Sequence, residues 1–192
     1  MDILESGVGY ALMRITQELD DVADQVATED PMALARFSEQ VVEAGRVFVL
    51  GAGRSGLALQ MTAMRLMHLG LDVHVVGEVT APAIGADDLL LTASGSGTTE
   101  GIVRNARSAV SVGARVAVIT TAAESPLAAL ASALIVVPAA GKLDRSESAS
   151  NQYAGSLFEQ SVVLIGDALF HALWKRSGRS ADELWPRHAN LE

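Results

Sequence analysis

The first 45 residues carry the hydrophobic spacing of two helices. Apolar side chains recur at intervals of three and four residues from Leu4 to Val26, which places them on one face of an amphipathic helix. Asp30 and Pro31 then match the N-cap and the first position of a second helix, and Gly45 matches its end. Residues 1–45 are therefore predicted to form two N-terminal helices.

Short runs of branched apolar residues alternate with helical patterns over residues 46–138. Such runs are typical of strands buried on both faces, and they are Val47–Leu50, Val73–Val76, Leu89–Ala93, Val116–Thr120 and Leu134–Val137. Helical patterns between them cover Ser55–Leu69, Thr99–Val112 and Pro126–Ala131. This alternation predicts an α/β fold, a five-stranded parallel sheet flanked by helices in a flavodoxin- or Rossmann-like three-layer sandwich.

The remaining chain divides at about residue 156. Residues 139–155 are polar and show no periodicity, which predicts a loop long enough to suspect function. Residues 156–192 are predicted to form a long helix that ends near Gly178, followed by a short tail. The apolar run Ser161–Trp174 within that helix is shorter than a membrane span. With 192 residues in total, the chain is predicted to be a single domain.

Composition narrows the choice of partners. The chain has 14 Lys and Arg against 23 Asp and Glu, a net charge of −9, and it would repel the phosphates of a nucleic acid. It contains no cysteine, which suits a reducing compartment, and its first residues are acidic where a signal peptide is basic. We expect a cytoplasmic protein with no nucleic-acid or membrane partner.

Two glycine-rich segments follow predicted strands and open predicted helices. The first, Gly51–Gly56, fits the G-x-G-x-x-G pattern of dinucleotide-binding proteins, and Glu78 supplies an acid about 20 residues further on. An NAD-binding Rossmann protein is therefore one alternative. Such an enzyme usually needs further chain for a substrate domain, and almost none remains here.

The second segment, Ser94–Thr99, combines glycines with hydroxyl side chains at a predicted helix start. Glycines free backbone N–H groups to face an anion, and the helix dipole adds positive potential. The structural alternative is a tight turn with a Ser or Thr cap. Two such segments at the ends of different parallel strands favour a phosphate-binding function, and a dinucleotide fold would need only the first of them.

The same residues resemble a known family. Gly51–Ser55 and Ser94–Thr98 look like the two signatures of the sugar isomerase (SIS) domain. More narrowly, Met64–Gly70, Phe158–Gln160 and the ending Arg187–Glu192 resemble the 6-phospho-3-hexuloisomerases, with similarity over essentially the whole chain. The stretch from Asp144 to Ser150 matches no motif of that family.

The resemblance implies both an activity and an assembly. The family interconverts D-arabino-hex-3-ulose 6-phosphate and D-fructose 6-phosphate, in the ribulose monophosphate pathway of formaldehyde fixation, and forms tetramers built from dimers. The apolar stripe of the opening helix also needs a partner, so we expect a homotetramer. The alternative within the fold is a SIS module that binds a sugar phosphate without altering it. Such sensors are typically joined to a DNA-binding module.

Three residues are candidates for proton transfer. Glu159, near the start of the last long helix, is similar to the catalytic glutamate of SIS isomerases and is our candidate base, although a first-turn Glu is also ordinary. His188 lies in the short tail, which we expect to be poorly held by its own domain and to pack across a subunit interface. His68 is the second choice, because the methionines before it, Met61, Met64 and Met67, are expected in the core.

The candidate binding residues lie mainly in the two glycine-rich segments. Arg54 is the only cation there and can bond to phosphate or to a substrate hydroxyl. The predicted phosphate-binding set is Gly53, Arg54, Ser55, Ser94, Gly95, Ser96, Gly97, Thr98 and Thr99, with Glu78 and Thr80 as weaker candidates for sugar hydroxyls. No His and carboxylate spacing matches a metal site, and proton transfer through an enediol needs no cofactor, so we expect neither.

Overall fold

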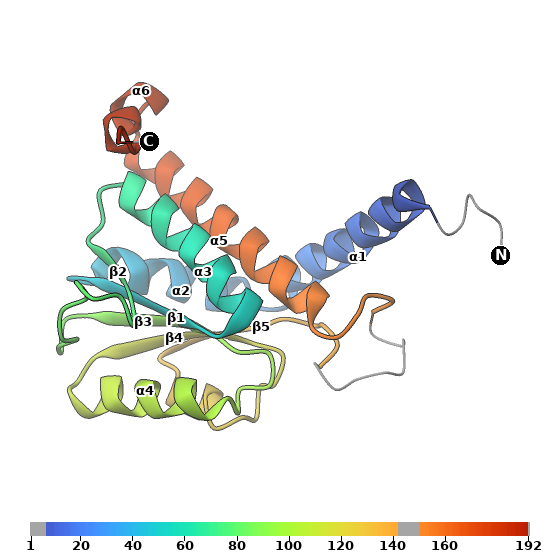
Figure 1. Ribbon diagram of the computed structural model, residues 1–192, viewed down its shortest axis with the longest axis horizontal. Helices are drawn as coiled ribbons and strands as arrows, with labels where there is room; N and C mark the ends of the chain where they lie inside the picture. The colour runs from blue at the N-terminus through green and yellow to red at the C-terminus, as the bar shows by residue number, and fades with distance from the viewer. Residues whose placement is uncertain (1–6, 142–149, 192) are drawn as a thin grey trace.

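Five parallel strands form one sheet in the computed structural model, which describes residues 7–141 and 150–191 (Figure 1). The strand order is β2-β1-β3-β4-β5. The strands are β1 (Val47–Gly51), β2 (Val73–Val75), β3 (Leu89–Ala93), β4 (Arg115–Thr120) and β5 (Ala133–Val136). Every predicted strand is present within one residue at each end.

Helices cover both faces of this sheet, so the predicted three-layer sandwich is confirmed. On one face lie α1 (Val8–Glu29), α2 (Pro31–Glu43), α3 (Gly53–His68) and α5 (Ser156–Ser177). The other face carries α4 (Glu100–Ser111) and the short helix η1 (Ala128–Leu130) (Figure 1). The chain then forms α6 (Ala181–Leu184) and η2 (Trp185–Arg187) beyond the end of α5.

Local signals set the helix ends as predicted. The Asp30 carboxylate accepts a hydrogen bond from the Ala33 N–H at 2.8 Å, and Pro31 occupies the first turn of α2. Gly178 ends α5. The predicted loop over residues 139–155 is irregular at both described ends, and its part from 142 to 149 lies outside the described residues.

Helix α5 packs closely along α3. Gly166 makes the approach possible, because a Cβ at that position would lie only 3.1 Å from the Cβ of Thr62 on α3 and would overlap its hydroxyl. By length and composition alone, the 22 residues of α5 would be enough to cross a membrane. The apolar run Ser161–Trp174 considered in the sequence analysis is shorter than this helix. The buried residues along α5, among them Val162 and Leu169, belong to the core on this face of the sheet.

Two apolar stripes are exposed over part or all of their length. The N-terminal half of α1 projects from the body (Figure 1), so Val8 is 88% and Leu12 64% exposed, whereas Val22 is buried. The expectation that the α3 methionines lie in the core is wrong, because Met61, Met64 and Met67 are all exposed. Their three-residue spacing does not follow the buried face of α3, which carries Ala58, Leu59, Thr62, Ala63 and Leu66.

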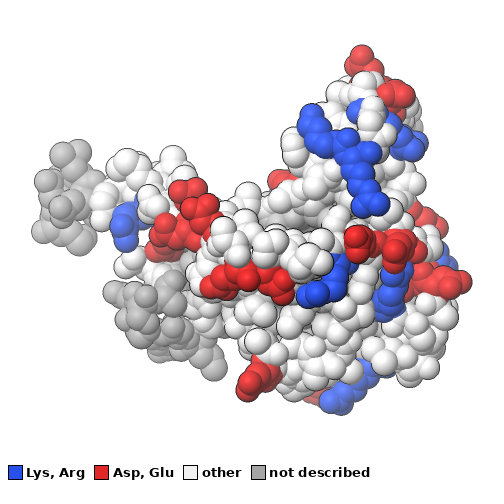
Figure 2. Space-filling view, turned by 180° about the vertical axis from the view of Figure 1, so that it is seen from behind, with Lys and Arg blue, Asp and Glu red and all other residues white. Residues whose placement is uncertain are grey.

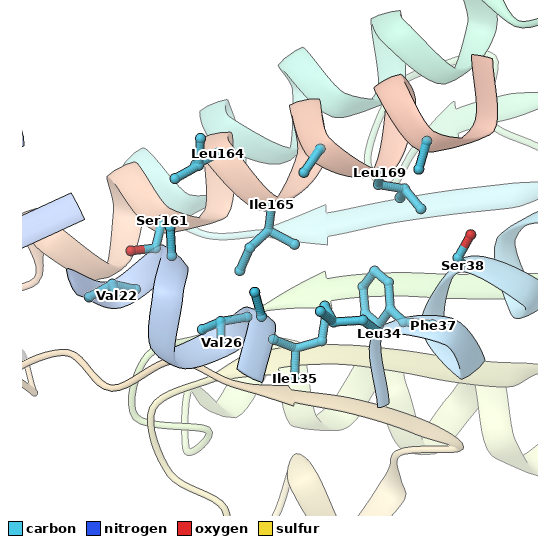
Figure 3. A pocket seen from close by; sticks show the side chains of 14 residues that line it. Val22, Val26, Leu34, Phe37, Ser38, Ile135, Ser161, Leu164, Ile165 and Leu169 are labelled. Atoms are coloured by element: carbon cyan, nitrogen blue, oxygen red, sulfur yellow. The ribbon is translucent and has the colours of Figure 1, made fainter. Parts of the chain in front are cut away.

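An apolar hollow lies between α1, α2, β5 and α5. Figure 3 shows Val26, Leu34, Ile135 and Ile165 around it, and its only polar side chains are those of Ser38 and Ser161. A phosphate needs several N–H, hydroxyl or cationic partners, and among the described residues that line this hollow only Ser38 and Ser161 carry such a side chain. The polar chemistry therefore has to be sought at the strand ends.

Candidate active site

The two glycine-rich segments begin side by side at the carboxyl edge of the sheet. Strands β1 and β3 are neighbours, and their register pairs Gly51 with Ala93, so both strands end at the same level. The chain leaves β1 towards α3 on one face and β3 towards α4 on the other. Adjacent strands whose connections diverge in this way create the crevice in which ligands bind in open parallel sheets.

Hydroxyl groups organise the segment after β3. Ser94 is buried, and its Oγ lies 3.1 Å from the Oγ1 of Thr99. Ser96 is exposed, and its Oγ accepts hydrogen bonds from the N–H of Thr98 at 3.3 Å and from the Thr98 hydroxyl at 3.0 Å. The segment is thus an ordered turn that presents the Ser96 and Thr98 hydroxyls to solvent.

Residues at the end of β4 hold this turn in place through hydrogen bonds. The sequence analysis missed this contribution. The Gly95 carbonyl accepts hydrogen bonds from the Thr120 hydroxyl at 3.1 Å, the Thr121 N–H at 3.1 Å and the Thr121 hydroxyl at 2.9 Å. Gly97 adopts φ +61°, and a Cβ there would overlap the Ser125 side chain. A Thr-Thr pair at a strand end was the available signal, because such hydroxyls can bond a neighbouring loop.

Helices α3 and α4 both start at this edge, and both can hold an anion. Neither has a side-chain cap on its first turn among the described residues: α3 follows Ala52, and α4 follows Thr99. First-turn N–H groups without such a cap, together with the helix dipole, favour a bound anion. Gly53 and Arg54 open α3, and Ser55 is buried in its first turn.

Glu159 lies beside both segments. Its Oε2 is 3.0 Å from the Nε of Arg54, an ion pair in which the Arg54 side chain is 60% exposed and that of Glu159 is 23% exposed. The preceding Phe158 packs against Gly95, where a Cβ would lie 3.3 Å from the aromatic ring. The structure therefore brings Glu159, Arg54 and the Ser94–Thr99 turn together, although Glu159 is at least 60 residues away along the chain from that turn.

Glu78 and Thr80 are less closely connected to this site. They follow β2, which pairs with β1, and both are exposed. Within the described part of the chain, no side-chain hydrogen bond or ion pair joins either residue to the two segments. Across the same residues, no group of three or more His, Cys, Asp or Glu side chains is suited to hold a metal ion.

His68 and His188 lie together at the opposite end of α3. Their rings stack with centroids 4.1 Å apart, and Trp185 covers His188 at 4.7 Å. Burial lowers the pKa of His68, and the neighbouring His188 and Arg65 lower it further. Fourteen residues separate Arg54 from His68, so the two ends of the helix are roughly 21 Å apart at 1.5 Å per residue. One chain does not bring these histidines to Glu159.

The tail is held by its own domain, contrary to expectation. The Arg179 guanidinium donates to the Leu69 carbonyl at 2.9 Å, and Leu184 is buried. Arg187 lies against Gly70, and the histidine stack adds aromatic contact. Basic side chains gather over this end of the molecule (Figure 2), and they include Lys175, Arg176, Arg179 and Arg187.

Comparisons with known proteins identify a family and named relatives. The SIS domain model matches residues 40–153. A protein of Mycobacterium gastri named 3-hexulose-6-phosphate isomerase is 57% identical over 173 residues, which cover 90% of this chain and 87% of that protein. A protein of Bacillus subtilis with the same name is 36% identical over 180 residues, 93% of this chain and 95% of that protein.

Solved structures show the same fold. A crystal structure of a hypothetical protein from Methanococcus jannaschii, described as inferring a molecular function of 3-hexulose-6-phosphate isomerase, is similar with a TM-score of 0.82 and 27% identity. The similarity covers 95% of this chain and 99% of that one. The resemblance predicted from the two glycine-rich segments and the chain ending is confirmed: the chain belongs to the SIS domain family.

Proposed function

We propose that this protein interconverts 3-hexulose 6-phosphate and fructose 6-phosphate. The relatives named for this activity cover nearly the whole chain, which supports the substrate. The observation that carries the reaction is the Glu159 carboxylate, 3.0 Å from Arg54 and beside two anion-binding segments. A base and a phosphate cradle in one crevice are what the reaction requires, and this ion pair supports that assignment.

The reaction moves a carbonyl from carbon 3 to carbon 2. Glu159 removes the proton from carbon 2 of the 3-ketose, the carbonyl oxygen on carbon 3 takes up a proton, and the carbon 2–carbon 3 bond becomes the double bond of an enediol. The proton then returns to carbon 3 while the carbon 2 hydroxyl loses its own proton and becomes the new carbonyl. A single carboxylate on one face of the enediol can carry the carbon-bound proton both ways.

The phosphate binds between the starts of α3 and α4. Ser55, Ser94, Ser96 and Thr98 supply hydroxyl donors, and first-turn N–H groups add to them. Arg54 pairs with Glu159 in the free protein and can turn towards the phosphate or a sugar hydroxyl, because its side chain is mostly exposed. Glu78 and Thr80 are proposed to meet the sugar hydroxyls at the β2 end of the crevice.

A second copy of the chain completes the site in this proposal. His188 and His68 are too far from Glu159 of their own chain, so they serve as acid–base or positioning groups for the Glu159 of a neighbouring subunit. Two exposed apolar surfaces support association: the projecting half of α1 with Val8 and Leu12, and the α3 stripe with Met61 and Met64. We propose a homotetramer assembled as a dimer of dimers.

Sedimentation tests the assembly directly. A tetramer of the 20.0 kDa chain sediments with a mass of about 80 kDa. A mass near 20 kDa at micromolar concentration would contradict the assembly. We further propose that the protein works in the cytoplasm. A chain without cysteine suits a reducing compartment, and a net charge of −9 favours solubility in water.

A turnover assay with 3-hexulose 6-phosphate tests the function. The expected result is formation of fructose 6-phosphate, measured by a coupled enzyme. Binding without turnover would instead favour the non-catalytic sugar-phosphate module. Thermal stabilisation by NAD would favour a dinucleotide-binding protein, and the strand order β2-β1-β3-β4-β5, which is that of flavodoxin-like folds, argues against the classical dinucleotide arrangement.

A further inference from the structure

The Glu18 carboxylate on α1 makes an unusual number of hydrogen bonds to one short segment. Its Oε2 accepts from the Ser150 hydroxyl at 2.7 Å and from the Gln152 side-chain amide at 3.0 Å. Its Oε1 accepts from the Asn151 backbone N–H at 2.9 Å and from the Asn151 side-chain amide at 3.3 Å. One side chain thus binds three consecutive residues that lie more than 130 positions away.

These donors are neutral, so Glu18 serves as an anchor for the chain and not as half of an ion pair with this segment. Partial burial raises the pKa of Glu18, but the hydrogen bonds from Asn151, Gln152 and Ser150 outweigh it and hold the pKa below its ordinary value. The carboxylate therefore stays ionised near neutral pH, when its hydrogen bonds are strongest. We call Glu18 with Ser150–Gln152 the α1 clamp.

The clamp holds the chain just before it enters α5. The N-cap of α5 is Gly155, which has no side chain to cap the helix. Ala154 adopts φ +52°, a left-handed conformation that costs energy in a residue with a Cβ and persists only when its surroundings enforce it. The Ser156 N–H and hydroxyl both bond to the Tyr153 carbonyl, closing the turn at 3.2 and 2.8 Å.

Glu159 is one turn into this helix. Its N–H donates to the Gly155 carbonyl at 3.0 Å, so any shift of the entry turn moves the Glu159 backbone with it. The Glu159 carboxylate pairs with Arg54 and, in the proposed reaction, faces the bound sugar. A displacement of a catalytic group by about 1 Å can lower the rate about 100-fold. The phosphate-binding segments start from β1 and β3, and Phe158 in the first turn of α5 touches one of them at Gly95.

We propose that Glu18 is a positioning residue, which fixes the entry to α5 through the α1 clamp and thereby sets the place of Glu159. The inference rests on the proposed function, in which Glu159 is the base. It makes α1 part of the support of the catalytic site. Loss of the clamp should impair the chemical step and leave phosphate binding intact.

Glu18→Ala and Glu18→Gln test the proposal. We expect kcat to fall about 10- to 100-fold in Glu18→Ala while KM stays within about twofold, because only the base is displaced. Glu18→Gln should fall less, since its amide keeps one acceptor oxygen. Removing single donors with Ser150→Ala or Gln152→Ala should give the same pattern at smaller size. Asp20→Asn, an exposed carboxylate on the same helix, is the matched control and should change nothing.

Backbone amide exchange separates failure of the clamp from failure of the proposed function. In Glu18→Ala the amides of Asn151 and Glu159 should both exchange faster than in the parent protein. The exchange measurement is repeated with Glu18→Ala combined with Glu159→Gln, because amide exchange reports the position of the helix without requiring turnover. Unchanged exchange at Glu159, or a kcat within twofold of the parent protein in folded Glu18→Ala, would overturn the inference. Full turnover in Glu159→Gln alone would instead overturn the assignment of the base.

Discussion

The two ends of α3 differ in how far one chain satisfies its polar groups. At the start, Arg54 and Glu159 form a partly exposed ion pair beside first-turn N–H groups that have no side-chain cap among the described residues. At the other end, His68 is buried beneath His188, and the Leu69 carbonyl accepts a hydrogen bond from Arg179. The first end is prepared for a ligand, and the second is closed by its own tail.

This difference teaches that the proposed acid–base groups divide into two sets. Glu159 belongs to the crevice of its own chain, whereas His68 and His188 lie roughly 21 Å away along the helix. A catalytic site that uses all three needs two copies, and the exposed apolar surfaces of α1 and α3 offer a way to join them. The following predictions test each end in turn.

The largest expected effect is at the open end. Glu159→Gln keeps the size and shape of the side chain but removes its ability to accept a proton, so turnover should fall about 10²–10⁴-fold. Competition by inorganic phosphate should survive, because the phosphate-binding segments are unchanged. Steady-state kinetics measure both the turnover rate and the inhibition constant of inorganic phosphate. Asp167→Asn is the matched control, since Asp167 also lies on α5 opposite an arginine of α3, at 4.0 Å from Arg65, and its turnover should be normal.

His188→Ala tests whether the closed end serves a neighbour. Turnover should fall towards the lower end of that range, because an assisting group is lost while the base remains. Mixing Glu159→Gln and His188→Ala subunits should restore activity that neither parent has, since some sites then combine both intact groups. His171→Ala, exposed on α5, is the control. Proven subunit exchange without recovery would show that His188 does not act in a neighbouring site.

Ser96→Ala probes the phosphate end of the crevice. A hydrogen bond to a charged group contributes about 1.5–3 kcal/mol, so KM should rise roughly tenfold or more while the fold is retained. Sulfate inhibition should weaken in parallel. Ser108→Ala is the control, because that hydroxyl bonds the Arg104 carbonyl within α4. An unchanged KM in Ser96→Ala would exclude this hydroxyl from the phosphate site.

The smallest effect concerns stability at the closed end. Burial, His188 and Arg65 lower the pKa of His68 in the folded protein, so the unfolded chain binds a proton more readily. His68 therefore destabilises the fold as pH falls below about 6.5, and the effect levels off below its folded pKa. Melting temperatures between pH 7.5 and 5.5 should fall less in His68→Asn than in the parent protein; equal slopes would contradict the prediction.

Much of the fold could be predicted because it follows from local patterns. Each strand is a short apolar run, since a parallel strand is buried on both faces, and Asp30 marks a helix start by its own hydrogen bond. The α3 methionines show the limit of that reasoning. Their apolar character is a local fact, but which face of α3 is covered depends on where α5 and the sheet pack.

The candidate site could be predicted only in part. The two glycine-rich segments were found because a strand followed by glycines and hydroxyls is a local signal for anion binding. Thr120 and Thr121, which fix the Gly95 carbonyl, gave only the weaker signal of two hydroxyls at a strand end, and Glu18, which holds the entry to α5, gave none. Their roles exist only through contacts with residues distant in the chain.

The sequence by itself determined which segments become strands and helices and where the glycine-rich turns fall, and its resemblance to the SIS family indicated Glu159 as the candidate base. The tertiary structure alone decided that β1 and β3 are neighbours, that Arg54 meets Glu159, and that His188 stacks on His68 at the far end of α3. The physical reason is the distance along the chain over which each interaction acts. Backbone preference and side-chain periodicity act over a few residues, whereas the packing that unites distant groups is settled only when the whole core forms.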